Sequence, residues 1–178
     1  MKRIVGIFLF TLLALTARAQ GGIPLLDRVE GHRVSFHYTY SLSQKGSEFA
    51  AVTDGDVTVE ENAYILEGLG LKVISDGVTR WSLDSDAMEA VAETVEKEDI
   101  FTNPALFIGA YKDYMDKIKV NSQGSDSLDV TLTLDDETRA RFLLQGIVYQ
   151  DMQGKSDFSI DEKSLSKEYV ITDLRQSI

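Results

Sequence analysis

Two pairs of aspartates and two histidines are the side chains of this sequence best suited to acid–base chemistry. Asp54 and Asp56, and again Asp84 and Asp86, are separated by one residue, a spacing that could bring two carboxylates together. Both pairs lie among glycine and serine, where aspartate is favoured because its side chain accepts hydrogen bonds from the backbone of turns. We therefore interpret all four as turn residues and not as catalytic acids.

The histidines, His32 and His37, have no sequence context that indicates a catalytic base. A histidine that activates a serine belongs to a recognisable arrangement, and the chain has no Gly-x-Ser-x-Gly elbow. Gly68-Leu69-Gly70 lacks the third glycine and the following helix of a dinucleotide-binding loop. We predict no catalytic residues, no cofactor and no enzyme activity.

The composition excludes several classes of protein. The 178 residues include 18 basic and 29 acidic side chains, which give a formal net charge of -11. Nucleic-acid binding is disfavoured, because phosphate backbones require a positive surface. The sequence contains no cysteine, so disulfides, thiolate chemistry and Cys-bound zinc or iron–sulfur clusters are excluded. Two histidines are too few for a histidine-rich metal site, and we predict no metal site.

The first twenty residues have the pattern of a secretory signal peptide. Met1-Lys2-Arg3 is positively charged, residues 4–15 are almost wholly apolar, and Ala17-Arg18-Ala19 places small residues at a cleavage site. The apolar run is shorter than the ~20 residues that span a bilayer. We predict cleavage after Ala19, which divides the chain into a signal peptide of residues 1–19 and a single exported domain of residues 20–178.

Alternation of apolar and polar residues predicts that most of this domain is β-sheet. The clearest case is residues 33–42, in which every second residue from Val34 is apolar. Short polar turns join successive segments, as in an antiparallel sheet. The other predicted strands are residues 48–60, 64–69, 71–75, 79–83, 128–134, 139–149 and 168–172.

Two stretches depart from the alternation. Asn103-Pro104 is typical of a helix start, with Asn103 as the cap and Pro104 in the first turn. Residues 87–95 fit both a helix and a strand, and both interpretations stay open. The chain is therefore expected to be one α+β domain, mostly sheet, with helical segments near residues 24–30 and 103–115.

Six segments, taken in order, carry a resemblance to a known family. They are Val34-Ser35-Phe36 and residues 55–59, 62–66, 74–81, 103–106 and 171–175. Together with the signal peptide and the absence of cysteine, they resemble the periplasmic outer-membrane lipoprotein carriers, the LolA-like proteins, over most of residues 33–175.

The resemblance implies a curved antiparallel sheet that forms an unclosed half-barrel, with its concave face capped by short helices. It also implies a monomeric carrier in the periplasm of a Gram-negative bacterium. Such a carrier binds the acyl chains of lipoproteins, or a related lipid, and ferries them to the outer membrane. Its partners would be an inner-membrane release complex and an outer-membrane acceptor.

One departure from the family concerns the lid over the ligand. In well-known carriers an arginine on the hairpin between the second and third strands helps to hold the lid closed. The matching place here is near Glu61-Asn62, which contains no arginine. How the lid would open is therefore not indicated by the resemblance.

The alternation of apolar and polar residues along the strands places many aromatic side chains on one face of the sheet. This predicts an apolar cavity, because a curved sheet with few helices does not close over all its inward side chains. Burial of each methylene of an acyl chain in such a cavity is worth about 0.8 kcal/mol. The predicted lining residues are Phe36, Tyr38, Tyr40, Val57, Val59, Tyr64, Leu66, Trp81 and Leu83 on the early strands, Leu106 and Phe107 on the helix, and Leu132 and Phe142 on the far wall.

Two other functions remain open from the sequence. The same fold could serve as a periplasmic module that senses a lipid or a protein instead of transporting it, which the missing hairpin arginine favours. An exported hydrolase would need acid–base or nucleophilic residues that meet in a pocket. The sequence offers for this only the aspartate pairs and the two histidines.

Overall fold

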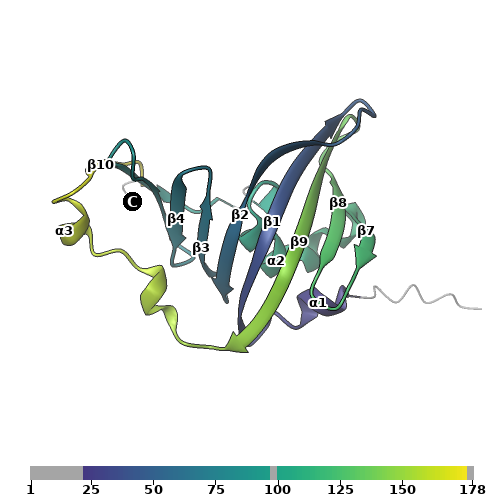
Figure 1. Cartoon of the computed structure of the whole chain (residues 1–178), viewed down its shortest axis with the longest axis horizontal. Helices are drawn as coiled ribbons and strands as arrows, with labels where there is room; N and C mark the ends of the chain where they lie inside the picture. The colour runs from purple at the N-terminus through teal and green to yellow at the C-terminus, as the bar shows by residue number, and fades with distance from the viewer. Residues whose placement is uncertain (1–21, 97–99, 176–178) are drawn as a thin grey trace, which may run out of the picture.

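The sheet predicted from the alternation is present, and it is curved and unclosed (Figure 1). The computed structural model describes residues 22–96 and 100–175, so the predicted signal peptide lies outside the described residues. Within them, ten strands follow the order β10-β6-β5-β4-β3-β2-β1-β9-β8-β7 across one sheet. The strands are β1 (His32–Gln44), β2 (Ala50–Glu60), β3 (Ala63–Gly68), β4 (Leu71–Ser75), β5 (Thr79–Asp84), β6 (Glu89–Thr94), β7 (Ile118–Gln123), β8 (Leu128–Thr133), β9 (Thr138–Asp151) and β10 (Val170–Asp173).

Every neighbouring pair in this sheet is antiparallel except β10 and β6, which are parallel. The antiparallel prediction is therefore correct for the hairpin-connected strands. The exception arises because β10 reaches the sheet edge through a long connection and not through a short turn. That connection begins at the end of β9, which six strands separate from β10 in the sheet (Figure 1).

The ambiguous residues 87–95 form a strand, since β6 covers Glu89–Thr94. Its Ala90 lies opposite Leu83 of β5, and its Ala92 lies opposite Trp81. Both alanines are fully buried, so pairing with β5 decides between two interpretations that the spacing alone left equal. Strand β7 was not predicted, because most of its residues are exposed and its apolar Ile118 and Val120 alternate with polar residues over only the first half of the strand.

The helical elements are short, and the one predicted from Asn103-Pro104 is confirmed. Helix α2 spans Pro104–Ala110, and the Asn103 side chain accepts hydrogen bonds from the backbone N–H groups of Ala105 (2.9 Å) and Leu106 (3.4 Å). Proline fits the first turn because its missing N–H would have no helical partner there. The others are α1 (Pro24–Asp27), α3 (Glu162–Leu165) and the 3-10 helices η2 (Tyr111–Lys117) and η3 (Lys155–Phe158).

The two halves of the sheet bury opposite faces. We call the face packed by α1, α2 and η2 the helix face, and the other the outer face. Strands β1, β2, β8 and β9 turn their apolar residues to the helix face. In the other half, Ile74 of β4 pairs with Trp81 of β5. The register of the intervening strands places both on the same face as Ser35 of β1 and Thr58 of β2, which is the outer face. Strands β4, β5 and β6 therefore bury the outer face.

Residues 152–173, which we call the C-terminal strap, cover the outer face of that second half. The strap leaves the end of β9, crosses the sheet and ends as β10 (Figure 1). Four of its side chains pack on the apolar residues of β4, β5 and β6. These four are Ile160, Leu165, Tyr169 and Ile171.

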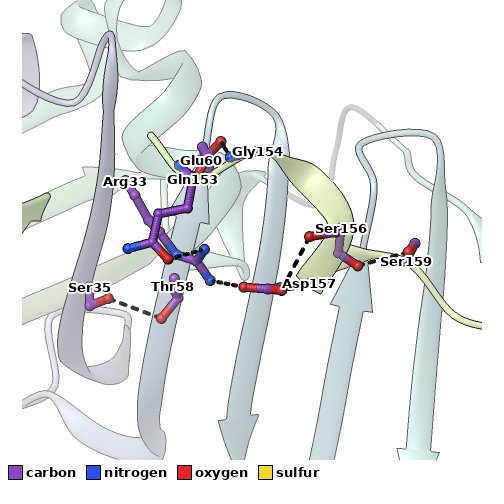
Figure 2. Close-up of polar contacts among 9 residues, drawn as sticks. All are labelled: Arg33, Ser35, Thr58, Glu60, Gln153, Gly154, Ser156, Asp157 and Ser159. Carbon is purple, nitrogen blue, oxygen red and sulfur yellow. Dashed lines mark hydrogen bonds and ion pairs between the residues drawn. The ribbon is translucent and has the colours of Figure 1, made fainter. Parts of the chain in front are cut away.

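A polar cluster anchors the beginning of the strap to β1 and β2, and Figure 2 shows these contacts. The buried Glu60 carboxylate accepts hydrogen bonds from the backbone N–H groups of Gln153 (3.0 Å) and Gly154 (2.8 Å). Arg33 donates to Asp157 (2.9 Å) and lies over the ring of Phe158, 5.1 Å from its centroid. The buried Glu60 carboxylate thus accepts from two backbone N–H groups of the strap that no regular secondary structure serves.

Replacement of Glu60 by glutamine tests this anchor. The amide of Glu60→Gln offers one uncharged acceptor oxygen in place of two carboxylate oxygens, so one strap N–H loses its partner and the other loses a charge-assisted hydrogen bond. We expect the free energy of unfolding, measured by urea denaturation, to fall by about 1–3 kcal/mol. The exposed Glu48→Gln serves as the control. Equal stability of the two variants would contradict the anchoring role of Glu60.

Candidate functional site

The predicted lining residues do not form one set. Most belong to a single apolar cluster on the helix face, in which Leu66 and Leu106 are partly buried and the rest are buried. That group comprises Phe36, Tyr38, Tyr40, Val57, Val59, Tyr64, Leu66, Leu106, Phe107, Leu132 and Phe142.

Trp81 and Leu83 are the exceptions, because they lie on the outer face under the strap. The prediction that they line the same wall of a cavity as Phe36 is wrong. Alternation within a strand shows which of its residues share a face, but the register between strands decides which face that is. The pairing of Trp81 with Ile74, and of Leu83 with Lys72, sets that register.

The interior between the sheet and α2 is filled by its own side chains. Phe107 of α2 stacks on Phe142 of β9 with ring centroids 5.1 Å apart, and Tyr40 packs against the same ring at 5.2 Å. Phe107 and Phe142 have no exposed surface, and neither does Leu132. In this structure, the hollow expected behind these residues is therefore a packed core.

An apolar pocket of about 590 Å³ lies beside that core, between α1, α2 and the tip of the β2–β3 hairpin. Its volume falls within the range of small-molecule sites. Two predicted residues, Val59 and Leu106, line it. Exposed polar side chains at the pocket include Glu61 and Lys112.

The other pocket residues were not singled out from the sequence. Leu26 and Val29 come from α1 and the turn after it, and their three-residue spacing was the available signal for an apolar helix face. Gly109 of α2 contributes open space: a Cβ atom there would have the Glu61 carbonyl oxygen, 4.0 Å away, as its nearest neighbour. Such space cannot be anticipated from a glycine in a sequence.

A polar clasp made of Asp27, Tyr111 and Lys112 holds α1 to η2. The Tyr111 hydroxyl donates to Asp27 Oδ1 (2.6 Å) and accepts from the backbone N–H of Ile23 (3.3 Å). Lys112 Nζ lies 3.2 Å from the same Asp27 oxygen. On the other side of α1, Tyr149 of β9 donates to the Leu25 carbonyl (2.7 Å). Polar contacts thus fix one wall of the pocket.

The clasp also sets the charge states of its members. Burial and the hydrogen bond to Asp27 raise the pKa of Tyr111 to about 12. The hydrogen bonds from Tyr111 and Lys112 lower the pKa of Asp27 below its usual 3.8. At neutral pH the tyrosine therefore keeps its proton and the aspartate its charge, which is the combination that the hydrogen bond requires.

The hairpin tip at Glu61-Asn62 is tied to the strap and not to the helices. Lys155 Nζ lies 2.7 Å from Glu61 Oε2 and donates to Asn62 Oδ1 at 2.6 Å. The hairpin position that matches the arginine of the lipoprotein carriers is thus bonded to Lys155 of the strap. In this chain α1 is held instead by the clasp.

Asp54 and Asp56 lie within β2, so their interpretation as turn residues was wrong. Both face His37: its Nδ1 is 3.0 Å from Asp56 Oδ1, and its Nε2 is 3.8 Å from Asp54 Oδ2. All three side chains are exposed on the outer face. By contrast Asp84 does form a turn, since its Oδ1 accepts from the backbone N–H groups of Asp86 and Ala87.

These carboxylates do not assemble a metal centre. Within residues 22–96 and 100–175, no group of three or more metal-binding side chains is placed to hold an ion. The same part of the chain contains no helix whose length and apolar character would let it span a bilayer.

No model of a known protein family matches the chain, and a search of curated proteins finds no match either. The resemblance to the lipoprotein carriers therefore rests on the segments that carry it. The fold, the pocket and the clasp are the features of this chain that bear on its function.

Replacement of Tyr111 by phenylalanine tests the clasp through its pH dependence. Because the folded pKa of Asp27 is depressed, its contribution to stability is present above the unfolded pKa and is lost as the pH falls through the folded one. Tyr111→Phe removes the main cause of the depression. We expect the variant to be less stable than the wild type near neutral pH, and the difference to shrink below about pH 4.

The measurement is urea denaturation at several pH values, with Tyr114→Phe as the matched control. Tyr114 lies on the same 3-10 helix, and among the described residues its ring packs on Phe101 while its hydroxyl makes no hydrogen bond. A stability difference for Tyr111→Phe that stays constant from neutral to acid pH would show that the hydroxyl does not act through Asp27.

Proposed function

We propose that this protein is an exported, periplasmic carrier that holds an acyl chain, of a lipoprotein or a related lipid, in the pocket between α1 and α2. The observation that carries the proposal is the pocket itself, which is about 590 Å³ in volume and lined mainly by apolar side chains. Most of its polar side chains are already paired within the protein, Asp27 with Tyr111 and Lys112, and Glu61 and Asn62 with Lys155, so a hydrocarbon in the pocket would leave few of them unpaired.

The energetics of acyl binding fit such a pocket. About a dozen buried methylenes supply roughly 10 kcal/mol before the entropic costs of binding. A carrier must also release its cargo, so a wall that moves is an advantage over a closed cavity. Helix α1 is only four residues long; Leu25 and Leu26 anchor it in the core cluster, and the clasp and Tyr149 add polar contacts. Displacement of α1 would enlarge the pocket toward the packed core behind it.

The fold supports the same proposal at a coarser level. An unclosed, curved sheet with short helices on one face agrees with what the resemblance to the LolA-like carriers implied. Transfer from an inner-membrane release complex to an outer-membrane acceptor, by a monomer, is part of the proposal on that ground. The formal charge of -11 would keep such a carrier away from anionic headgroups between the two transfers.

A second candidate is a periplasmic module on the same fold that senses a lipid or a protein. One observation favours it: the interior behind α2 is filled by aromatic side chains, with Phe107 stacked on Phe142. A sensor needs no room for a whole acyl chain. A carrier and a module that senses a protein differ in whether the α1–α2 pocket takes up hydrocarbon, and this can be measured.

Substitutions at Gly109 separate the candidates without disturbing the core. Gly109→Leu places a branched side chain in the open space of the pocket, whereas Gly109→Ala adds one methyl group. Both replace glycine within α2 and should raise helix stability by similar amounts, up to about 1 kcal/mol. We expect Gly109→Leu to weaken binding of a fluorescent fatty-acid probe at least about tenfold, and Gly109→Ala to bind nearly as the wild type does.

Titration of the probe into the purified protein, followed by its fluorescence, provides the measurement. Unfolding midpoints of the two variants control for changes in the fold. A wild-type protein that takes up no probe, or a Gly109→Leu variant that binds as well as the wild type, would remove the carrier proposal and leave the sensing module.

A further inference from the structure

A second pocket, of about 420 Å³, lies on the outer face over β7, β8 and β9. Strands β7 and β8 lie at the opposite edge of the sheet from β10, and the pocket lies near the start of β9, whereas the strap leaves the end of β9 and runs toward β10 (Figure 1). We call this pocket the basic basin, because Lys119, Arg139 and Arg141 line it together with a single carboxylate, Asp129. It lies on the opposite face from the α1–α2 pocket and is independent of the proposed carrier function.

The positive charge of the basin is unusual in this chain. The sequence has 29 acidic and 18 basic residues, yet the basin gathers three cations around one anion. Among the described residues, neither Lys119 nor Arg139 has a carboxylate within 4.0 Å; Arg139 donates only a long hydrogen bond, 3.4 Å, to Ser43 Oγ. Like charges that share a concave site repel one another, so their grouping indicates a ligand of opposite charge.

Hydrogen bonds hold the floor of the basin in place. The Asp129 carboxylate accepts from Arg141 through Nε (2.9 Å) and Nη2 (2.6 Å), and its Oδ1 also accepts from Asn121 Nδ2 (2.9 Å). The same Asn121 nitrogen donates to Thr131 Oγ1 (2.9 Å). Within the part of the chain that the structure describes, Nη1 of Arg141 has no hydrogen-bond acceptor, and the negative charge of Asp129 is paired with one guanidinium. The basin therefore keeps its donors oriented and its net charge positive.

An aromatic wall completes the basin. The guanidinium carbons of Arg139 and Arg141 lie 5.7 Å and 5.9 Å from the centroid of the Phe49 ring. Phe49 is half-buried and comes from the segment just before β2, so it covers the two arginines from the side. An aromatic ring next to a guanidinium restricts its motion and its hydration, which strengthens its hydrogen bonds to an anion.

We propose that the basic basin binds a phosphate group, either free or as a phosphomonoester. A phosphomonoester carries about −1.5 to −2 charges and three acceptor oxygens, which matches the two unpaired cations and the free edge of Arg141. Arginine presents parallel N–H donors that suit phosphate oxygens, and lysine adds a point charge. The hydroxyl groups of Thr131 and Thr133 supply neutral donors at the same floor.

An acidic hairpin borders the basin and limits its affinity. Asp135 Oδ1 accepts hydrogen bonds from the backbone N–H groups of Glu137 (2.8 Å) and Thr138 (2.7 Å). Glu137 Oε2 lies 3.7 Å from Lys45 Nζ. Asp136 lies between them and lines a shallow depression that shares Arg139 with the basin. Its negative charge opposes a bound anion, so its removal should strengthen phosphate binding.

The test is a titration of inorganic phosphate into the isotope-labelled full-length mature protein, followed by backbone amide NMR signals at constant ionic strength. We expect shifts that saturate at residues of β7, β8 and the start of β9. Lys119→Gln and Arg139→Gln should each weaken binding at least about tenfold, since charge-assisted hydrogen bonds are the strong ones. Lys72→Gln, which removes a charge on β4, is the matched control, and Asp136→Asn should bind more tightly.

A second arm of the experiment identifies the source of the phosphate. Sedimentation with vesicles that contain phosphatidic acid, compared with phosphatidylcholine alone, shows whether a lipid headgroup occupies the basin. Binding of such vesicles that is lost in Lys119→Gln assigns a lipid headgroup, and phosphate binding without vesicle binding assigns a soluble phosphate compound. Absence of both, or binding that Lys119→Gln and Arg139→Gln leave unchanged, would overturn the proposal.

Discussion

The change of buried face across the sheet is the constraint on which the rest of the structure depends. Strands β1, β2, β8 and β9 are apolar toward the helices, whereas β4, β5 and β6 are apolar toward the strap. A sheet of this kind needs a cover on each face, because an exposed apolar face of several strands is not stable in water. The short helices serve one half and residues 152–173 serve the other. Arg33 and Glu60 fix the strap where the two halves meet.

Local patterns predicted the elements well and their assembly less well. The alternation in residues 33–42 and the Asn103-Pro104 start were sufficient, since each depends on neighbouring residues alone. The outer-face position of Trp81 depends on inter-strand register, and the strand at residues 89–94 depends on pairing with β5. The strap was not predicted, except for its final strand, because its packing on β4, β5 and β6 depends on tertiary contacts that no local pattern shows.

The candidate site shows the same division. Val59 and Leu106 were found because they are apolar residues at regular positions, while Gly109 and the clasp were not. An empty volume belongs to the arrangement of three elements and has no signature in any one of them. Likewise Asp27 and Tyr111 are far apart in the sequence, and only the packing of α1 against η2 brings them into hydrogen-bond distance. The filled interior behind Phe107 and the open pocket beside it thus both follow from where the helices lie.

The proposed carrier function requires that a hydrocarbon chain occupy the pocket between α1 and α2. The most direct measurement is an isotope-filtered NOE experiment on the protein with a saturating medium-chain fatty acid. We expect contacts between the chain methylenes and the methyl groups of Leu26, Val59 and Leu106, which line the pocket. Contacts confined to exposed apolar residues elsewhere, such as Leu69 or Val170, or no contacts at all, would contradict it.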